Sequence, residues 1–271
     1  MPKTILITGA SSGIGKATAR HFQEQGWNVV ATMRSPQNET ELNQLDRVLV
    51  TRLDVQDSAS IHSAVKETID TFGGLDVLLN NAGYGAAGPL EAAPMDEIRR
   101  QFDVNVIGLL ETTKAVLPHF RAQKSGKIIN VSSVGGRVTF PLFSLYHGTK
   151  WAVEGISESL NYELASSGIQ VKIVEPGAIA TDFAGRSLAF LNDESLTEYQ
   201  STVQNVTGAF SNFTDTASPP SLVAEVVQQA AEDDSAQIRF VAGEDAKEWL
   251  KARDEVGDVA FMGAIRERFG L

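Results

Sequence analysis

Residues 4–15 of the chain read TILITGASSGIG, an apolar run followed directly by a turn that contains three glycines. The apolar run over 4–7 predicts a buried strand, and the spacing of apolar residues over 13–25 predicts an amphipathic helix. Glycines between a strand and a helix let the backbone turn tightly and approach a phosphate group at the helix N-terminus. The stretch therefore predicts a dinucleotide-binding site at the start of the chain.

The segments that follow alternate between strand and helix patterns. Further strands are predicted at residues 28–32, 47–53, 75–79, 127–131, 169–174 and 238–241, and helices at 58–72, 95–122, 147–166 and 220–232. The nearly continuous apolar character of the strands indicates burial on both faces, and the alternation indicates parallel pairing. We therefore expect an α/β fold, a single-domain Rossmann-type doubly wound parallel sheet with helices on both faces, over residues 1–271.

Residues 178–217, after the sixth strand, lack a clear strand period. Aromatic residues are scattered among polar ones there, and an irregular stretch of this length in a compact domain is usually functional. We expect a substrate lid at 178–217 that is mobile over 183–215. The role of residues 243–271 stays open.

Composition and charge exclude several classes of function. The formal net charge of −11 argues against a nucleic-acid partner, because phosphate contacts need a basic surface. The chain has no cysteine, which excludes disulfides, thiolate catalysis and cysteine-ligated metals, and we predict no metal site. No apolar run reaches the roughly 18 residues of a membrane span, and no signal peptide precedes the first strand, so we expect a cytoplasmic protein.

Residues 9–13 also match the Gly-x-Ser-x-Gly nucleophile turn of serine hydrolases, with Ser11 as the nucleophile and His119 or His147 as its base. Such a turn needs earlier strands to supply a second oxyanion donor, and only a few residues precede this one. The dinucleotide interpretation is therefore favoured, with a serine hydrolase as an alternative.

The end of the second predicted strand bears on the choice of cofactor. In many dinucleotide-binding folds an acidic residue about 20 residues beyond the glycines holds the adenosine ribose, but here Met33 and Arg34 occupy that point. A guanidinium suits a 2′-phosphate, to which Ser12 or Ser11 can add a hydroxyl donor. NADP(H) is therefore predicted as the preferred cofactor, with NAD(H) as the alternative. The competing interpretation of Arg34 is an ordinary solvated cation.

Tyr146 and Lys150 are four residues apart in a predicted helix, so their side chains share one face about 5–6 Å apart at Cβ. A free phenol has a pKa of about 10, and a nearby ammonium lowers that pKa, which makes Tyr146 a candidate acid or base. Ser133 ends the fifth predicted strand and residues 80–83 end the fourth. Because the carboxyl ends of parallel strands meet at one crevice, these groups are expected to lie together.

At this point the chain resembles the short-chain dehydrogenase/reductase family, over about residues 3–182, and is similar to its hydroxysteroid and retinol branch. The resemblance is carried by Thr8, Gly9, Gly13, Gly15, Asp54, residues 80–83, Asn105, Ser133, Tyr146, Lys150, Pro176, Gly177 and Thr181. It implies an NAD(P)-dependent oxidoreductase acting on a C=O or CH–OH group. Family members usually form homodimers or homotetramers, and we expect one of these assemblies.

The resemblance also implies roles for four residues. Tyr146 would exchange a proton with the substrate oxygen, and Ser133 would hydrogen-bond that oxygen. Lys150 would lower the pKa of Tyr146 and hold the nicotinamide ribose, while Asn105 would tie Lys150 to a proton-relay water. The residues expected to contact the cofactor are Thr8, Gly9, Ser11, Ser12, Gly13, Ile14, Gly15, Arg34, Asp54, Val55, Asn81, Ala82, Gly83, Tyr146, Lys150, Pro176, Gly177, Ile179 and Thr181.

Aromatic residues near Tyr146 suggest the substrate class. Phe140 and Phe143 lie between Ser133 and Tyr146, and Phe183 follows the sixth strand. If they line one pocket together with Ser133 and Tyr146, the substrate is a small hydrophobic ketone, aldehyde or secondary alcohol. An NADP-sensing regulator without turnover is the alternative from another class, although a sensor would not need the Tyr-Lys-Ser-Asn set.

Overall fold

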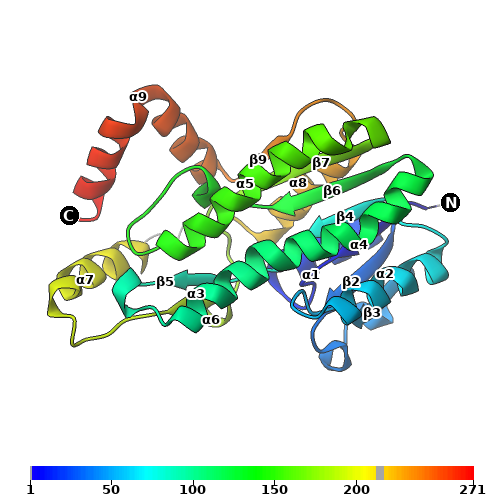
Figure 1. Cartoon of the computed structure of the whole chain (residues 1–271), viewed down its shortest axis with the longest axis horizontal. Coiled ribbons are helices and arrows are strands. Elements are labelled where there is room, and N and C mark those ends of the chain that lie inside the picture. Colours follow the sequence, from blue (N-terminus) through cyan, green and yellow to red (C-terminus); the bar gives the residue numbers. More distant parts are fainter. Residues whose placement is uncertain (1, 212–216) are drawn as a thin grey trace.

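Seven parallel strands form one central sheet, seen in the computed structural model of residues 2–211 and 217–271 (Figure 1). The order across the sheet is β3-β2-β1-β4-β6-β7-β9. The strands are β1 (Thr4–Ile7), β2 (Asn28–Met33), β3 (Val48–Arg52), β4 (Val77–Asn80), β6 (Gly126–Val131), β7 (Ile169–Pro176) and β9 (Arg239–Ala242). The helices are α1 (Gly13–Glu24), α2 (Ser58–Phe72), α3 (Met95–Phe102), α4 (Gly108–Gln123), α5 (Ser144–Leu164), α6 (Phe183–Arg186), α7 (Thr197–Ser211), α8 (Pro220–Glu232) and α9 (Glu244–Arg268).

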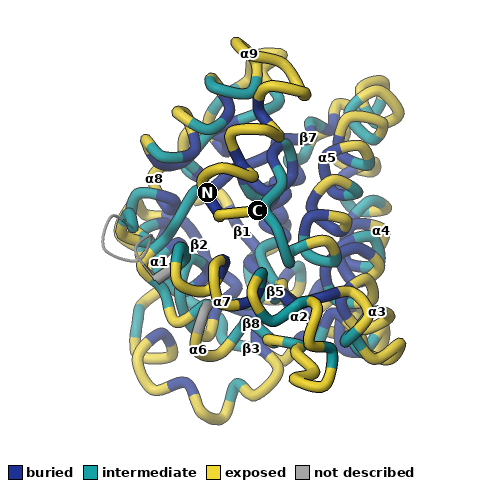
Figure 2. The backbone as a smooth tube through the Cα atoms, turned by 90° about the vertical axis from the view of Figure 1, so that its left-hand side faces the viewer, coloured by how far each residue is buried: buried dark blue, intermediate teal, exposed yellow. Residues whose placement is uncertain are grey.

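Alternate residues of each strand face opposite layers of helices. In β1, Ile5 and Ile7 belong to a core cluster with side chains of α1 and α8, whereas Leu6 belongs to one with α2, α4 and α5. All three side chains are fully buried, since helices cover both faces of the sheet. Figure 2 shows the buried backbone inside the molecule and exposed turns on the outer sides of the helices. The predicted Rossmann-type doubly wound sheet is thereby confirmed.

The strand order places the functional crevice. The order reverses between β1 and β4, because β2 and β3 lie on one side of β1 and all later strands lie on the other. Ligands of open parallel sheets bind beyond the carboxyl ends of the strands at such a point. The glycine turn after β1 and the Asn-Asn-Ala-Gly turn after β4 flank this position.

Two predictions of secondary structure need correction. The helix expected over 95–122 is interrupted by a π-helical segment, Asp103–Ile107, between α3 and α4. The region 178–217, expected to be irregular, contains α6, β8 (Leu188–Phe190) and α7, while its residues 212–216 lie outside the described part of the chain. β8 pairs in parallel with β5 (Gly85–Ala87), a short strand after β4. Three-residue strands are too short to show a period in sequence, so tertiary contact alone reveals this second sheet.

The C-terminal helix α9 extends beyond the sheet and bends at Gly257, whose φ is +74° (Figure 1). Its apolar side chains and the following Phe269 pack on Phe140, on Phe210 of α7 and on Val241 of β9. The C-terminal helix thus shares one apolar cluster with α7, β9 and the loop after β6. In residues 2–211 and 217–271, no helix has both the length and the apolar character needed to cross a bilayer.

Candidate active site

The glycine turn is held in a form that leaves its backbone accessible. Gly9 and Gly13 have φ values of +69° and +53°, a region that favours glycine. A Cβ on Gly15 would lie 2.3 Å from the Gly9 carbonyl oxygen and 2.6 Å from Asn81 Nδ2. Thr8 Oγ1 accepts hydrogen bonds from the backbone N–H groups of Asn81 and Ala82 at 2.9 and 3.0 Å. The turn after β1 and the turn after β4 therefore form one rigid unit.

Gly15→Ala is expected to unfold part of this unit, because the added methyl group overlaps backbone that cannot move independently. We expect a loss of about 1–3 kcal/mol in unfolding free energy, as for other overpacked sites, and a clear loss of dinucleotide affinity. Urea unfolding and fluorescence titration measure the two effects. Gly155→Ala in α5, where nothing lies within 4 Å of the new Cβ, is the matched control.

A cavity of about 1120 Å³ lies at the carboxyl ends of the strands and gathers most of the predicted site. It is lined by Gly9, Ser11, Ser12, Gly13, Ile14, Arg34, Asp54, Val55, Asn81, Ala82, Gly83, Ser133, Phe140, Phe143, Tyr146, Lys150, Pro176, Gly177, Ile179, Thr181 and Phe183. Three residues of the predicted set, Thr8, Gly15 and Asn105, are absent from this lining. Thr8 and Asn105 are buried behind the wall, where they hold the lining residues in place.

Tyr146 and Lys150 project from α5 into this cavity. Lys150 Nζ lies 5.7 Å from the centroid of the Tyr146 ring and donates a hydrogen bond to the Val131 carbonyl at 2.9 Å. Burial lowers the pKa of Lys150 to about 8, against the opposing charge of Glu154. Burial also raises the pKa of Tyr146, and a hydrogen bond with Ser133 opposes that rise. The expected lowering of the Tyr146 pKa by Lys150 stays a prediction.

Asn105 lies in the π-helical segment, and both its amide oxygen and its amide nitrogen form hydrogen bonds within the protein. Its Oδ1 accepts a hydrogen bond from Tyr84 N at 3.0 Å, and its Nδ2 donates to Tyr84 O at 2.8 Å and to Thr149 Oγ1 at 3.1 Å. Thr149 Oγ1 in turn donates to the Tyr146 carbonyl at 2.8 Å. Asn105 therefore supports the start of α5 at Tyr146. Its expected link to Lys150 through water stays a prediction.

Sequence reasoning missed His147 as a support of the site. Its Nε2 accepts a hydrogen bond from Phe140 N at 2.9 Å and its Nδ1 donates to the Gly135 carbonyl at 2.8 Å. Burial lowers its pKa to about 4, so the ring is neutral near pH 7. These two hydrogen bonds hold the loop from Ser133 to Phe140 against α5. The position of His147 next to Tyr146 in the sequence was the only feature that could have identified it as a support of the site.

The structure argues against the alternative of a serine hydrolase, because neither of the two histidines proposed as its base can act on Ser11. Both ring nitrogens of His147 are engaged by backbone groups of the loop after β6. His119 Nε2 accepts a hydrogen bond from Leu75 N, just before β4 begins and so at the opposite end of the sheet from Ser11. Neither histidine is placed to activate Ser11.

The adenosine side of the cavity carries two arginines. Arg34 follows β2 directly, is exposed and lines the cavity, and the structure of residues 2–211 and 217–271 gives it no ion-pair partner. Arg186, at the end of α6, donates a hydrogen bond from Nη2 to Ser12 Oγ at 2.9 Å. The sequence pattern did not single out Arg186, because its approach to the glycine turn depends on how the chain folds back after β7. Both guanidinium groups line the cavity, and Arg186 Nε also lies 3.7 Å from Asp182 Oδ2.

The three predicted substrate-binding aromatics fall into two groups. The ring centroids of Phe143 and Phe183 lie 6.5 and 6.0 Å from that of Tyr146, so both rings flank it. Phe140 packs against Trp249 and Phe269, with centroid distances of 5.2 and 6.2 Å. Phe140 thus belongs both to the cavity wall and to the apolar cluster that contains Trp249 and Phe269.

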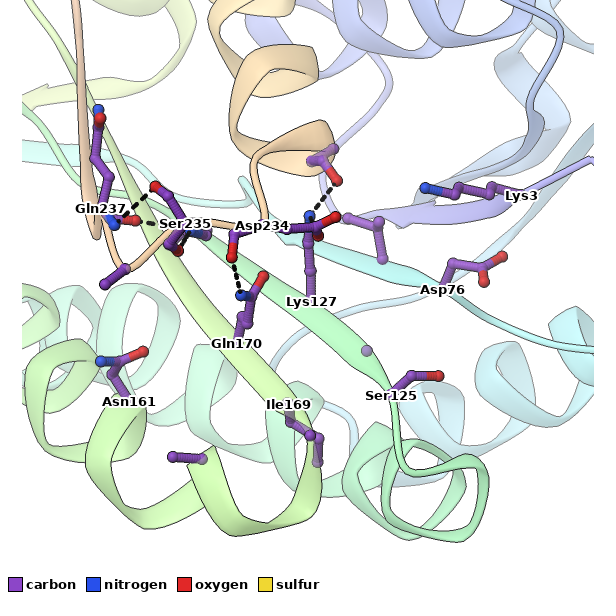
Figure 3. Close-up of a pocket in the computed structure, with 17 residues that line it drawn as sticks. Lys3, Asp76, Ser125, Lys127, Asn161, Ile169, Gln170, Asp234, Ser235 and Gln237 are labelled. Carbon is purple, nitrogen blue, oxygen red and sulfur yellow. Dashed lines mark hydrogen bonds and ion pairs between the residues drawn. The ribbon is translucent and has the colours of Figure 1, made fainter.

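A second cleft of about 700 Å³ lies at the amino ends of the strands (Figure 3). Two of its three lysines, Lys127 and Lys172, are bound by groups of the protein itself. Lys127 Nζ donates to the carbonyls of Ala231 and Asp233 at 2.8 and 2.9 Å. Lys172 Nζ is bound by Asp233 Oδ1 and by two backbone carbonyls, each at 2.8 Å. Lys127 and Lys172 fix the segment after α8, and the third lysine, Lys3, has its Nζ 5.5 Å from the centroid of the Trp27 ring.

Comparisons with known proteins agree with this geometry. A sequence profile described as short chain dehydrogenase matches residues 3–191. An uncharacterized oxidoreductase of Schizosaccharomyces pombe is 45% identical over 244 residues, 88% of this chain and 100% of the relative. The structure of a short-chain dehydrogenase from Streptomyces avermitilis has a TM-score of 0.85 and 33% identity, covering 94% of this chain and 93% of that one. The structure of ElxO with NADP bound has a TM-score of 0.75 and 27% identity, covering 92% and 100%.

Proposed function

Because the chain belongs to the short-chain dehydrogenase family of oxidoreductases, we propose that it transfers a hydride between NADP(H) and an apolar ketone, aldehyde or secondary alcohol. One observation carries the proposal. A single cavity brings the glycine turn and Arg34 together with Ser133, Tyr146 and Lys150. A nucleotide cradle and a proton-transfer group are thereby placed at two ends of the same space.

The residues present fit a nicotinamide dinucleotide. Gly9 and Gly13 have no side chains and adopt the positive φ values that the turn requires, and the N-terminus of α1 would face a phosphate bound there. ElxO, which is 27% identical, has been solved with NADP, and this supports a nicotinamide cofactor. The preference for NADP(H) over NAD(H) rests on Arg34 and Ser12 at the 2′-phosphate, with Asp54 at the adenine.

In the proposed mechanism the protein's own groups position the substrate and move its proton. The nicotinamide, when bound, supplies or accepts the hydride. Ser133 and Tyr146 hydrogen-bond the substrate oxygen, and Tyr146 donates a proton to it in reduction and accepts one in oxidation. Lys150 holds its positive charge beside the ring and orients the ribose. Asn105, through Thr149, keeps the start of α5 in place.

The proposal also includes the substrate pocket, the domain, the location and the assembly. Phe143 and Phe183 would hold an apolar substrate beside Tyr146. Residues 1–271 would act as one NAD(P)-binding domain, with 178–217 as its substrate lid. We also propose a cytoplasmic homodimer or homotetramer. The alternative is an NADP-sensing regulator without turnover, which the intact Tyr146, Lys150 and Ser133 set argues against.

Titrations of the protein with NADPH and, separately, with NADH test the proposal. The fluorescence of the nicotinamide reports binding in both. Tighter binding of NADPH, together with reduction of apolar ketones, would support it. Tighter binding of NADH would overturn the cofactor preference, and binding of neither would overturn the cradle. Binding without turnover over a broad panel of ketones and aldehydes would favour the sensor.

Arg34→Ala is expected to weaken NADPH binding by about 10- to 100-fold, because a charge-assisted hydrogen bond contributes about 1.5–3 kcal/mol. NADH, which lacks the 2′-phosphate, should bind as before. Arg121→Ala, an exposed arginine in the last turn of α4, is the control and should bind both cofactors unchanged. Equal losses for NADPH and NADH would contradict a role at the 2′-phosphate.

A further inference from the structure

Two glutamates lie buried behind the wall of the cavity. Glu154 follows Lys150 by one turn of α5 and is 5% exposed. Glu175 is the second-last residue of β7, directly before Pro176, and is fully buried. Neither side chain lines the cavity. The pair therefore touches the elements that carry Lys150 and the Pro176 turn without reaching the reacting groups.

The carboxyl oxygens of this pair are short of donors. Glu154 Oε2 accepts a hydrogen bond from Arg239 Nε at 3.0 Å. Glu154 Oε1 and both oxygens of Glu175 are buried, and within the described residues no donor forms a well-aligned hydrogen bond with them. The hydroxyl of Ser132 lies near Glu154 and opposes the rise of its pKa that burial causes. Buried carboxylate oxygens without donors are costly. A proton on one carboxyl group, donated to the other, would satisfy two of the three oxygens.

The charges around the pair do not remove this shortage. Arg239, on β9, also pairs with the exposed Glu158 at 2.7 Å and lies 3.4 Å from Glu175 Oε1. Arg137 lies 3.9 Å from Glu175 Oε2 and pairs with Asp254 of α9 at 3.6 Å. The two arginines thus face Glu154, Glu175, Glu158 and Asp254, while Lys150 lies one helical turn before Glu154 on α5. Each arginine is shared, so two full charges on the buried pair are not balanced.

We propose that Glu154 and Glu175 share one proton and form a single negatively charged carboxyl pair that stabilises the ammonium of Lys150 from behind. The pair would thereby act as a positioning group, not as a catalytic one. Burial and the neighbouring Glu154 raise the pKa of Glu175 to about 7, in agreement with a retained proton. The charge of Glu154 in turn raises the pKa of Lys150, against the effect of burial.

The shared proton makes stability depend on pH in a definite direction. Between pH 4.5, the ordinary pKa of a glutamate, and about 7, the folded protein holds a proton that the unfolded chain has released. The contribution of the pair to stability is therefore complete below pH 4.5 and is lost as the pH rises through about 7. The pair should shift the unfolding equilibrium by up to about tenfold per pH unit in this window. The lowered pKa of His147 acts in the opposite direction up to pH 6.5, so the contribution of the pair is measured as the difference between wild type and Glu175→Gln.

The variant Glu175→Gln distinguishes a carboxyl pair that shares a proton from one in which both carboxylates are charged and paired with arginines. The amide NH₂ can donate to Glu154 in place of the proton and cannot ionise, so we expect the contribution of the pair to the pH slope to vanish, which leaves the opposite slope that the lowered pKa of His147 produces. The variant should exceed wild type in stability above pH 7. Glu154→Gln should also remove the contribution of the pair. Glu158→Gln, which touches the same Arg239 but is exposed, should keep it. Lower stability of Glu175→Gln at every pH, with an unchanged slope, would overturn the shared proton.

Two spectroscopic measurements test the pair without turnover, so they stand even if the proposed reaction is wrong. Infrared spectroscopy at pH 6 should show a buried protonated carboxyl band that is lost in Glu175→Gln and in Glu154→Gln but kept in Glu158→Gln. A band kept in both buried variants would contradict the proposal. In ¹³C NMR of the lysine side chains, assigned with Lys150→Met, the double variant Glu154→Gln/Glu175→Gln should lower the Lys150 pKa below about 8. An unchanged value would overturn the link to Lys150.

Discussion

Tyr146→Phe is expected to reduce turnover of an apolar ketone by about 100- to 10,000-fold, the usual contribution of a general acid or base. The change removes one oxygen from a side chain that lines the cavity and lies between Phe143 and Phe183. The ring contacts remain, so folding and NADPH binding should be nearly unchanged. Steady-state kinetics with NADPH and a fluorescence titration of the cofactor measure the two outcomes.

Tyr162→Phe is the matched control for this prediction. Tyr162 lies on the same helix, α5, but is 79% exposed and does not line the cavity. Its replacement should leave turnover and binding at wild-type values. If Tyr146→Phe turned over as fast as wild type, Tyr146 would have no part in proton transfer. If it lost cofactor binding as well as turnover, its role would be structural.

Lys150→Met is expected to have opposite effects on activity and on stability. Lys150 is 9% exposed, and burial lowers its pKa to about 8 from an ordinary value of 10.5. An apolar side chain of similar length avoids the burial of a charge, at the loss of one hydrogen bond to Val131 O. We expect the unfolding free energy at pH 7 to rise by about 2 kcal/mol. Turnover should fall by about 100-fold or more, because no cation remains beside Tyr146.

The pH dependence gives a further check on Lys150. Between about 8 and 10.5 the folded protein has released a proton that the unfolded chain still holds. Wild-type stability should therefore gain a contribution as the pH rises across this window, and Lys150→Met should lack it. Urea unfolding from pH 7 to 10.5 measures the difference. Lys114→Met, on the exposed side of α4, is the control. Reduced stability of Lys150→Met at pH 7 would contradict the expected cost of the buried ammonium.

Some features of the site were open to prediction because they depend on local sequence. The glycines at 9, 13 and 15 and the spacing of Tyr146 and Lys150 are read directly from the chain, and a parallel sheet brings strand ends together. The structure accordingly places nearly all of the predicted residues on one cavity. The residues that hold the lining of that cavity in place were harder to predict from the sequence. His147 and Thr149 act through backbone groups and carry no motif of their own.

The sequence by itself determined the doubly wound sheet, because buried strands alternate with amphipathic helices and each pattern spans enough residues to be recognised. It also determined the identity of the groups at the strand ends. Only the tertiary structure decided that burial raises the pKa of Tyr146, that β5 pairs with β8, and that Glu154 and Glu175 are enclosed with too few donors. Desolvation, pairing of short strands and sharing of arginines depend on residues distant in the chain, and no local pattern encodes them.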